Sequence, residues 1–582
     1  MQMLSTLPTK CDQRVMRQLV EAILFEEIIP FVETEMNDGW KLFRFQGNEA
    51  TYQCMGKRSA FSRVRLTGSP LVCRDEGKQE IASITELIHD LPVSHEKKEK
   101  ILHELKQTVL LSARNEALLE KPISRRGLSY ERLEAALVEG HPYHPCFKAR
   151  TGFSIEDHER YGPEGEQAFQ LIWLGIRKED VTVSYPVEEH SFLQQELGHS
   201  VWKQVVQALC REGGQLYDYR LVPIHPWQWH ALKEDQLNEA ILKKEILYLG
   251  HFGDAYKATQ SLRTVMNQED IRKAHVKLPL NVVNTSSLRS IAPHLIAAAP
   301  SISAWLKRII ECDPFLKGEA NVQILTEYAG AAYEPSGKLW NRAVYGQIGC
   351  IYRESIATKM IGMEQAVPFN ALPLIEKDGD LFVTPYLESY GVEPWLKQLI
   401  EVSVIPVIHL LAKHGIALEA HAQNMVLVHE KGWPKRVILR DFHESLEYCK
   451  DFVQQPSWIP AFENLHEAFT DGAVDEYYWM SSIEALRELL MDTLFVYHLS
   501  ELSWQIEVVH GYTETQFWQL VDRVILEYIK KEIVPKERVK ALGLNAPIIT
   551  TESLLKRKLT AESVCSHTVR NELGKERYAC LQ

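Results

Sequence analysis

The chain has 582 residues, of which 45% are hydrophobic and 25% are charged, ordinary values for a globular protein with a substantial core. This composition excludes a disordered, collagen-like or coiled-coil chain. The 65 Lys and Arg residues against 78 Asp and Glu residues give a net charge of −13, so a nucleic-acid or anionic-membrane binder is a poor fit. An anionic substrate would need a local cluster of basic side chains.

The N-terminal part has the pattern of a small mixed domain. Apolar residues at three- and four-residue intervals predict a helix over 13–35. The segment 40–72 tends towards alternation of apolar and polar residues, which predicts short strands, and helical periodicity returns over 81–119. We expect a first domain, residues 1–130, that ends near 127–131.

The rest of the chain changes character once more. Residues 131–385 contain many short β-branched segments beside Pro and Gly, whereas residues 386–582 are strongly helical. The sequence therefore predicts an α+β fold with several subdomains: 1–130, 131–385 and 386–582.

Three helices are expected in the last part. The apolar stretch 396–411 is interrupted by polar residues and is shorter than the about 20 residues that span a bilayer, so we expect a buried core helix and no membrane partner. The stretch 483–502 carries apolar residues on most faces and should also be buried. A third helix, 517–533, follows Thr513 and Gln516, which have the spacing of a capping box.

Cysteine usage and the N-terminus indicate a cytoplasmic protein with reduced thiols. The ten cysteines are scattered and include no C-x-x-C pair, so neither a disulfide scaffold nor a thiolate zinc site is expected. Residues 1–14 lack a basic segment followed by an apolar run, so they do not read as a secretory signal.

The first candidate site is a basic block at 141–153, in which His141, His144, Lys148 and Arg150 fall within ten residues. Two prolines fix φ and remove amide donors, which predicts an extended segment. On an extended chain, His144, Lys148 and Arg150 project to the same face, and this face would suit a substrate with several carboxylates. The alternative is a solvated loop.

A second His-Pro pair, His225-Pro226-Trp227-Gln228, follows a β-like run. In isolation, it is better explained by a buried tryptophan with a histidine hydrogen bond than by a site.

Two further segments place hydroxyl groups two to four residues before an arginine. They contain Ser261 with Arg263 and Thr285 with Arg289, and they flank Lys277. Hydroxyls and guanidinium groups are natural partners of phosphate and carboxylate oxygens, because Arg offers parallel donors with a fixed charge.

The last block runs from 419 to 428 and continues after a predicted hairpin at 440–444. It contains His421, Asn424 and Asp441 beside strongly apolar runs. Asn and Asp supply the hard oxygen ligands that Mg²⁺ prefers alongside phosphate, so this layout indicates a metal–nucleotide site. A hairpin with polar ends is the alternative.

Together, these blocks resemble the siderophore synthetases that work without a non-ribosomal peptide template, the IucA/IucC family. The resemblance covers the chain from Glu139 to about Glu447, and the runs 366–370 and 441–444 resemble the petrobactin branch, which attaches a second polyamine arm. The family usually has His-Gly-Gln-Asn where this chain has Ala422 after His421, so this position must avoid positive φ.

The resemblance implies an ATP-dependent adenylation with Mg²⁺, a cytoplasmic homodimer and a cupped-hand fold of thumb, fingers and palm. A carboxylate of citrate or of a citryl monoamide would attack the α-phosphate of ATP, and an amine, such as spermidine or its dihydroxybenzoyl derivative, would then take the acyl group and release AMP.

The resemblance also implies roles for individual residues. Those expected to bind ATP are Ser261, Arg263, Lys277, Thr285, Arg289, His421, Asn424 and Asp441. Those expected to face the carboxylic substrate are His141, His144, Lys148, Arg150 and Arg289. The expected metal ligands are Asn424, Asp441 and Glu444, and the expected catalytic residues are Arg289, His421 and Lys148.

Two other classes of function compete with this interpretation. A kinase-like phosphotransferase is suggested by His421, Asn424 and the Asp441-Phe442 pair, but the chain has no glycine-rich phosphate loop and carries His443 where Gly would stand. A non-catalytic citrate or siderophore binder, or an iron–sulfur reductase, would not need these residue sets, and a cluster needs grouped cysteines.

Overall fold

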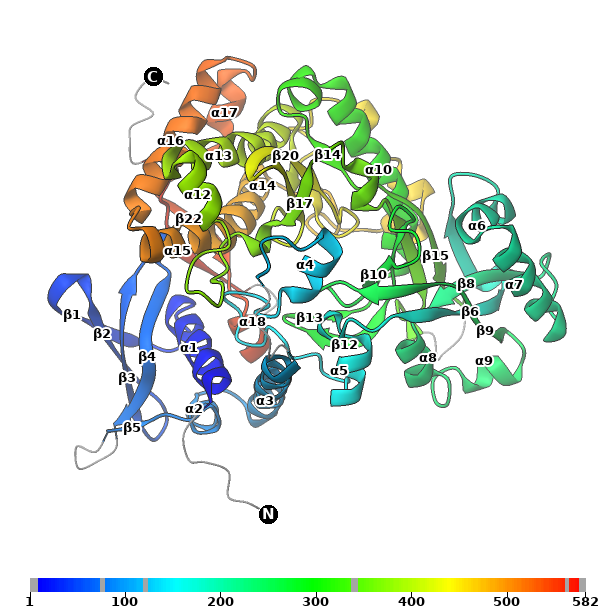
Figure 1. Cartoon of the computed structure of the whole chain (residues 1–582), viewed down its shortest axis with the longest axis horizontal. Helices are drawn as coiled ribbons and strands as arrows, with labels where there is room; N and C mark the ends of the chain where they lie inside the picture. The colour runs from blue at the N-terminus through cyan, green and yellow to red at the C-terminus, as the bar shows by residue number, and fades with distance from the viewer. Residues whose placement is uncertain (1–8, 74–78, 119–123, 336–343, 561–564, 575–582) are drawn as a thin grey trace.

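The computed structural model describes residues 9–73, 79–118, 124–335, 344–560 and 565–574. It confirms a mixed α+β protein, with three sheets of four or more strands. In Figure 1 the five-stranded sheet lies at the lower left, the eight-stranded sheet at the right, and most C-terminal helices at the upper left.

The N-terminal part is an antiparallel meander covered by a helix. The strands follow one another in the order β1 (Phe31–Glu35), β2 (Lys41–Gln46), β3 (Thr51–Arg58), β4 (Val64–Cys73) and β5 (Gln79–Ile81). Helix α1 (Lys10–Phe25) packs on β4, and α2 (Ile84–Asp90) and α3 (His95–Leu118) follow the sheet. The strands and helices predicted for 40–119 are therefore confirmed in type.

The predicted first helix was too long. A capping box of Thr9 and Asp12 starts α1, but the helix ends at Phe25. Glu27 then adopts a left-handed φ of 51° and Pro30 removes an amide donor, so the chain turns and continues as β1.

The central part is a large antiparallel sheet with the strand order β7-β15-β16-β11-β10-β9-β6-β8. The bounds of its strands are β6 Phe169–Arg177, β7 Val181–Ser184, β8 Tyr219–Ile224, β9 Ile246–Ala258, β10 Thr264–Asn267, β11 His275–Lys277, β15 Glu327–Tyr333 and β16 Gly349–Arg353. Helix α10 (Pro293–Cys312) packs on β15, and the hairpin of β12 (Leu280–Asn284) and β13 (Ser287–Arg289) follows β11.

Shorter helices surround this sheet. They are α4 Tyr130–Ala136, α5 Ile155–Tyr161, α6 Glu189–Leu197, α7 His199–Arg211, α8 Pro226–Leu232 and α9 Asn238–Leu242. His225 is the N-cap of α8: it is fully buried, and its Nδ1 accepts a hydrogen bond from the Trp227 amide at 3.1 Å. The expected histidine hydrogen bond is therefore present, but Trp227 itself is half-buried rather than buried.

The C-terminal part combines a four-stranded sheet, two strand pairs and many helices. The sheet order is β14 (Gln323–Ile324), β20 (Trp433–Leu439), β19 (Met425–Glu430) and β17 (Gln365–Pro368), and the pairs are β18 (Ile416–Leu418) with β21 (Leu446–Tyr448) and β22 (Ile548–Glu552) with β23 (Ser566–Arg570). The helices are α12 Thr384–Tyr390, α13 Val392–His409, α14 Ile483–Leu490, α15 Ser500–His510, α16 Glu514–Lys530, α17 Lys536–Leu542 and α18 Lys556–Leu559.

The three helices expected here are present. The apolar stretch forms α13 and a π-helical turn, and within the described residues Val392–His414 is the one helix long and apolar enough to cross a membrane; 83% of its most apolar window is buried inside the protein. It is therefore a core helix. The capping box of Thr513 and Gln516 starts α16 as predicted.

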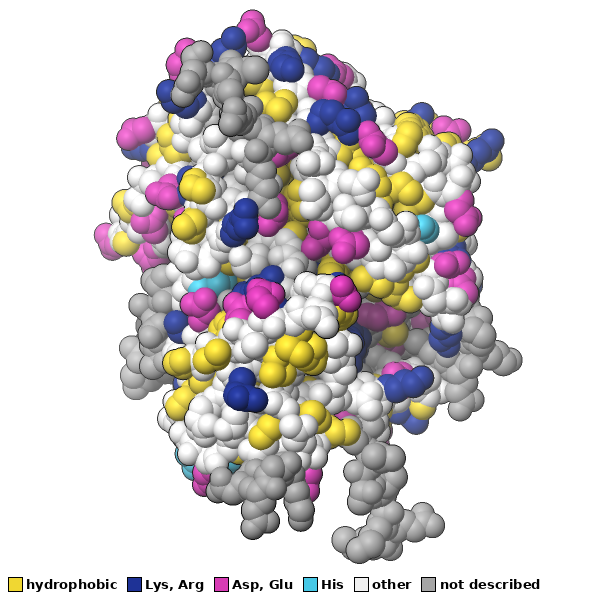
Figure 2. Space-filling view, turned by 90° about the vertical axis from the view of Figure 1, so that its left-hand side faces the viewer, with side chains coloured by type: hydrophobic (Ala, Val, Ile, Leu, Met, Phe, Trp, Pro, Cys, Tyr) yellow, Lys and Arg dark blue, Asp and Glu magenta, His cyan; other side chains and the backbone are white. Residues whose placement is uncertain are grey.

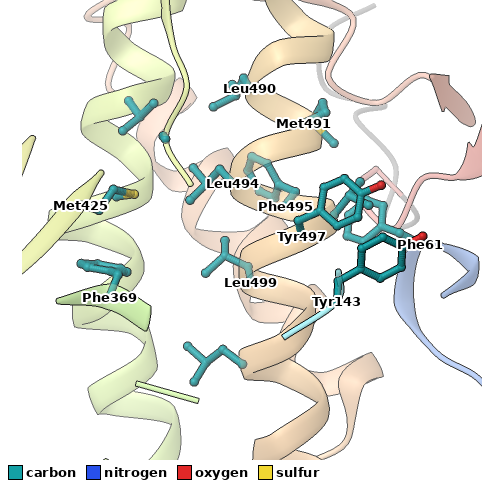
Figure 3. Close-up of a cluster of buried hydrophobic side chains, with 14 of the residues drawn as sticks. Phe61, Tyr143, Phe369, Met425, Leu490, Met491, Leu494, Phe495, Tyr497 and Leu499 are labelled. Atoms are coloured by element: carbon teal, nitrogen blue, oxygen red, sulfur yellow. The ribbon is translucent and has the colours of Figure 1, made fainter. Parts of the chain in front are cut away.

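The stretch 483–502 is helical throughout but contains a π-helical segment, η12 (Met491–Leu499), between α14 and α15. Figure 3 shows Leu494 and Leu499 of this segment directed towards Phe369 and Met425. On its other side, Tyr497 packs on Tyr143, with ring centroids 4.9 Å apart. The segment thus joins the C-terminal sheet to the basic block.

Two large cores hold the molecule together. One is confined to residues 153–352 and lies around the eight-stranded sheet, whereas the other contains side chains from α1 and the five-stranded sheet as well as from α13 and α16. The division at 130 and 385 stays a prediction, as does the description as thumb, fingers and palm.

The surface agrees with an acidic protein. On the face in Figure 2, Lys and Arg side chains stand in small groups among Asp and Glu side chains rather than in a continuous stripe. A concentration of basic groups must be sought inside the molecule.

Candidate active site

Asp441 lies where the central sheet meets the C-terminal sheet. It follows β20 and adopts a left-handed φ of 66°. Lys277 at the end of β11 and Arg353 at the end of β16 each place a nitrogen 2.9 Å from its Oδ1, because β11 and β16 are neighbours in the sheet. Burial alone would raise the pKa of Asp441, but Arg353 and Lys277 outweigh it and hold the pKa well below its usual range.

A second carboxylate binds another cation beside this pair. Arg263, in the turn between β9 and β10, donates to Glu444 Oε2 at 2.7 Å and to the Ser290 carbonyl at 2.7 Å. Burial would raise the pKa of Glu444, but Arg263 and His443 lower it to about 2. Both carboxylates are therefore ionised at neutral pH.

Arg289, at the end of β13, is the least satisfied of these cations. Its Nη2 donates to the Asn284 carbonyl at 2.9 Å, while its Nε is buried and has no hydrogen-bond partner among the described residues. Burial, with Arg263 nearby, lowers its pKa to about 10. A half-buried guanidinium whose buried Nε is unpaired fits an anionic ligand, since leaving that donor unpaired is costly.

The loop after β18 brings His421 and Asn424 to the same region. The Gln423 amide donates to His421 Nδ1 at 3.1 Å, and Asn424 Nδ2 donates to the Glu419 carbonyl at 3.0 Å. Burial lowers the pKa of His421 to about 4, so the imidazole is neutral. Ala422 does not have a positive φ, so the alanine is compatible with this loop.

The two predicted hydroxyl residues lie in tight turns. Ser261 Oγ is 3.0 Å from Thr259 Oγ1 and accepts from the Thr264 amide at 3.2 Å. Thr285 occupies the β12–β13 turn with a φ of 61°. Arg263 lies in the same turn as Ser261, and Arg289 ends the strand that follows the turn of Thr285, so each hydroxyl is close in the chain to one of the cations above.

The basic block differs from the expected extended segment. His141 and His144 each accept a hydrogen bond from a backbone amide two residues further on, and the segment forms a series of turns. The block has one extended contact to the site, a bridge between Thr151 and Val283 of β12. Burial lowers the pKa of His141 to about 3, and His421 contributes to this shift, so the two imidazoles lie within electrostatic reach of each other.

Lys148 and Arg150 do share a face, but this face meets Glu164. Arg150 binds the two oxygens of Glu164 at 2.7 and 2.9 Å, and Lys148 binds Oε1 as well. Lys148 and Arg150 are each 1% exposed, and Glu164 has no exposed side chain. Their expected role at the carboxylic substrate stays a prediction, because this arrangement places a protein carboxylate on both cations.

The pattern analysis missed several polar residues of the site. The carboxylate of Glu327, on β15, accepts from His443 Nδ1 at 2.7 Å and from the amides of Phe442 and His443. Arg440 donates to Glu134 Oε1 at 2.9 Å. Arg353 is the last residue of one apolar strand and Glu327 is the first residue of another. This position of a charged residue at a strand end was the only sequence pattern that could have indicated them.

The expected metal ligands have suitable chemistry. Among the described residues, the bonds to the side chains of Asn424, Asp441 and Glu444 use Nδ2, Oδ1 and Oε2, so each retains an oxygen that could bind a hard cation. Glu327, Asp441 and His443 also lie close enough together to hold a metal ion. The first set fits Mg²⁺ with a phosphate ligand better, because His443 Nδ1 is engaged by Glu327.

Four cations around two ionised carboxylates, at the junction of two sheets, define an enzyme centre for anionic small molecules. The profile of the IucA / IucC family matches residues 129–373, and that of the ferric iron reductase FhuF-like transporter family matches residues 393–565.

Individual relatives match nearly the whole chain. A citryl-spermidine/3,4-dihydroxybenzoyl-citryl-spermidine:spermidine ligase of Bacillus anthracis is 36% identical over 98% of this chain and 94% of its own. A 2-[(L-alanin-3-ylcarbamoyl)methyl]-3-(2-aminoethylcarbamoyl)-2-hydroxypropanoate synthase of Staphylococcus aureus is 33% identical over 98% of this chain and 94% of its own.

Solved structures agree. The petrobactin biosynthesis protein AsbB of Bacillus anthracis superposes with a TM-score of 0.92 at 36% identity, over 98% of this chain and 96% of its own. The aerobactin synthetase IucC of Klebsiella pneumoniae gives a TM-score of 0.79 at 24% identity, over 96% of this chain and 97% of its own, which supports the fold. The chain belongs to the IucA/IucC family of siderophore synthetases, which are ligases of siderophore biosynthesis.

Proposed function

We propose that the protein is an ATP-dependent ligase that joins a carboxylate of citrate, or of a citryl monoamide, to an amine. The observation that carries this proposal is the convergence of Arg263, Lys277, Arg289 and Arg353 in a chain with a net charge of −13. Two anions, a carboxylate and a triphosphate, repel each other, and such fixed cations offset this repulsion and hold the reactants in line.

The reaction then has two steps. A carboxylate oxygen attacks the α-phosphorus of ATP, forming an acyl–phosphate bond while pyrophosphate leaves with the electrons of the broken P–O bond. The amine nitrogen next attacks the acyl carbon, the C–O bond to AMP breaks, and the amine gives up a proton as the amide forms. No covalent enzyme intermediate is needed.

The proposed roles of the residues come from the family resemblance and are supported by their positions. Arg263, Lys277 and Arg289, with the hydroxyls of Ser261 and Thr285, would bind phosphate oxygens, and His421, Asn424 and Asp441 would border the nucleotide. Asn424, Asp441 and Glu444 would hold Mg²⁺, which supplies charge neutralisation at the phosphates. Neutral His421 can donate a hydrogen bond to the developing charge.

The acyl and amine substrates are proposed from the relatives. The names of two of them contain citryl-spermidine and an aminoethylcarbamoyl group, so a polyamine such as spermidine or its dihydroxybenzoyl derivative is the proposed nucleophile. Of the basic block, His141 is proposed for the carboxylic substrate, because it lies within electrostatic reach of His421. A homodimer in the cytoplasm, with the family's thumb, fingers and palm, completes the proposal.

Nucleotide product analysis tests this function. The purified protein would receive Mg·ATP, citrate or a citryl monoamide, and a panel of amines. AMP and pyrophosphate that depend on both acyl substrate and amine are the expected products. Formation of ADP would indicate the phosphotransferase, and the absence of turnover with every citrate derivative would indicate a binding protein.

A further inference from the structure

A second group of basic side chains lines a cavity outside the cation centre. The cavity has a volume of about 230 Å³ and is formed by helix α3, helix α18 and the β12–β13 hairpin, which lie close together in Figure 1. Four cations and one carboxylate line it: Lys97, Lys100, Arg557, Lys558 and Glu104. In a chain with a net charge of −13, this local excess of positive charge favours a bound anion.

Helix α3 presents one face to the cavity. Its lining residues follow the three- and four-residue spacing of a single helix face: Lys97, Lys100, Ile101 and Glu104. Glu104 is buried, and its Oε2 accepts from Lys558 Nζ at 2.5 Å. Among the described residues, Lys97 and Lys100 make no ion pair, so two neighbouring like charges stay without a counter-charge. Like charges at this spacing repel each other, and an anion bound between them removes the repulsion.

Helix α18 is held in place from inside the protein. The carboxylate of Glu26, which is buried, accepts hydrogen bonds from the amides of Leu555 and Lys556 at 2.9 and 2.6 Å, where α18 begins. Arg557, the next residue, binds Glu552 of β22. This wall of the cavity is therefore ordered before a ligand arrives, which lowers the entropic cost of binding.

The β12–β13 hairpin separates the cavity from the cation centre. Val283 of β12 and Leu288 of β13 are paired across the two strands, and both line the cavity. Arg289 follows Leu288 and is directed to the opposite face, because successive side chains of a strand alternate. Ser286, in the turn, also lines the cavity. An anion in the cavity would therefore contact the hairpin without using Arg289.

The lining residues determine which class of anion fits. The cationic groups and the Ser286 hydroxyl suit carboxylate oxygens, whereas Ile101, Val283 and Leu288 supply apolar surface for a carbon skeleton. At roughly 30 Å³ per water molecule, the cavity has room for about eight waters. This volume suits a small organic acid and is too small for a nucleotide.

We propose that this cavity binds a small polycarboxylate, an organic anion with two or three carboxylate groups, at a site separate from the cation centre. Lys97 and Lys100 of α3 bind carboxylate oxygens from one wall, and Arg557 and Lys558 bind them from the wall formed by α18. The apolar side chains of the hairpin contact the carbon skeleton. This inference goes beyond the proposed function and does not depend on it.

Protection of individual lysines from acetylation tests the site in the unaltered protein. An N-hydroxysuccinimide ester acetylates free lysine side chains, and peptide mass spectrometry measures the rate at each position. With citrate as the probe, at four times its dissociation constant, the rates at Lys97 and Lys100 should fall about fivefold, as occupancy of one site requires. Lys106 is exposed, lies about half a turn round α3 from Lys97 and does not line the cavity, so its rate should stay unchanged.

Two variants measure the contribution of one cation and the independence of the site. In Lys97→Gln, the dissociation constant for citrate, read from the protection of Lys100, should rise about three- to fivefold. Lys106→Gln, on the other face of α3, is the matched control and should change this constant by less than about 1.5-fold. Arg263→Gln weakens the cation centre without altering the cavity, so citrate should still protect Lys97 and Lys100.

The results that would overturn the site are equally specific. An unchanged dissociation constant in Lys97→Gln, or protection that sodium chloride reproduces at the same ionic strength, would show only charge screening. Protection by pyrophosphate but not by citrate would contradict a polycarboxylate ligand. Loss of protection in Arg263→Gln would mean that citrate acts from the cation centre. Formation of AMP, which tests the proposed function, is measured separately and does not decide between these results.

Discussion

Two carboxylates in this protein each bind one lysine and one arginine, yet their surroundings differ. Glu164 uses both oxygens for Lys148 and Arg150, and its side chain has no exposed surface. Asp441 uses only Oδ1 for its two cations, and 19% of its side chain is exposed. In the first cluster all three side chains are closed off from solvent, whereas in the second Lys277 and Arg353 are buried but the Asp441 carboxylate keeps one oxygen that no described residue binds and is partly exposed.

This comparison separates two kinds of basic motif that look alike in a sequence. Lys148 and Arg150 come from the densest basic block of the chain, but a protein carboxylate already occupies them. Lys277 and Arg353 lie in no such block, and strand pairing brings them together. A high density of basic residues in the sequence is thus weaker evidence for a binding site than side chains whose hydrogen-bonding groups remain unpaired in the folded protein.

Removal of the closed carboxylate should have the largest effect. Glu164→Gln keeps the shape but leaves two buried cations without a counter-charge, so we expect the free energy of unfolding to fall by about 3–5 kcal/mol. Urea denaturation measures this loss. Glu159→Gln, at the more exposed pair with Arg114, is the control and should cost less than about 1 kcal/mol. Equal losses in the two variants would contradict a closed, structural cluster.

Removal of the open carboxylate should affect activity more than stability. In Asp441→Asn, Lys277 and Arg353 lose the charge that orders them, so AMP production should fall about 100-fold. The free energy of unfolding should fall by only about 1–2 kcal/mol, because the Asp441 carboxylate is partly exposed and Lys277 stays within electrostatic reach of Glu327 and Glu444. Both quantities are measured beside Asp471→Asn, an exposed control. A stability loss as large as that of Glu164→Gln would remove the distinction between the two clusters.

The sequence predicted the element types well, but not where oppositely charged partners lie. Helical and alternating periodicity identified α16 with its capping box and the strands of 40–72, because these patterns are local. Glu164 stands between Pro163 and Gly165 in a turn with no motif that would predict an ion pair. It pairs with Arg150 because the chain folds back on itself after the basic block.

The same limit applies to the site. Arg263, Lys277, Arg289 and Asp441 were expected from motifs and do lie together, but Arg353 was not expected. It is brought to Asp441 by the pairing of β16 with β11, strands that are distant in the chain. Non-local pairing therefore decides which expected cations have partners and which remain available.

The buried His225, which supports the fold, should make the free energy of unfolding depend on pH. Burial lowers the pKa of His225 to about 3, so between pH 7 and pH 5 the unfolded chain takes up a proton at this residue and the folded protein does not. Protonation of His225 in the unfolded chain therefore lowers the free energy of unfolding by about 2 kcal/mol as the pH falls from 7 to 5.

The variant His225→Asn keeps an acceptor at the N-cap of α8 but cannot titrate. The difference in unfolding free energy between wild type and variant should shift by about 2 kcal/mol in favour of the variant from pH 7 to pH 5. His95→Asn shows the effect of removing an exposed imidazole. A constant difference for His225→Asn over this range would contradict a neutral, structural role.

The smallest effect is expected at Ala422, where this chain departs from the family pattern in the loop that carries His421 and Asn424. Ala422 lies between His421 and Gln423 with no positive φ, so the loop does not need the conformational freedom of glycine. Ala422→Gly should therefore cost at most about 0.5–1 kcal/mol of stability, through backbone entropy, and change kcat/KM less than about threefold. A large gain in activity would mean that the alanine holds His421 and Asn424 away from their working positions. The loop of His421 and Asn424 beside Asp441 would then have an unstrained resting conformation rather than the conformation that binds the nucleotide.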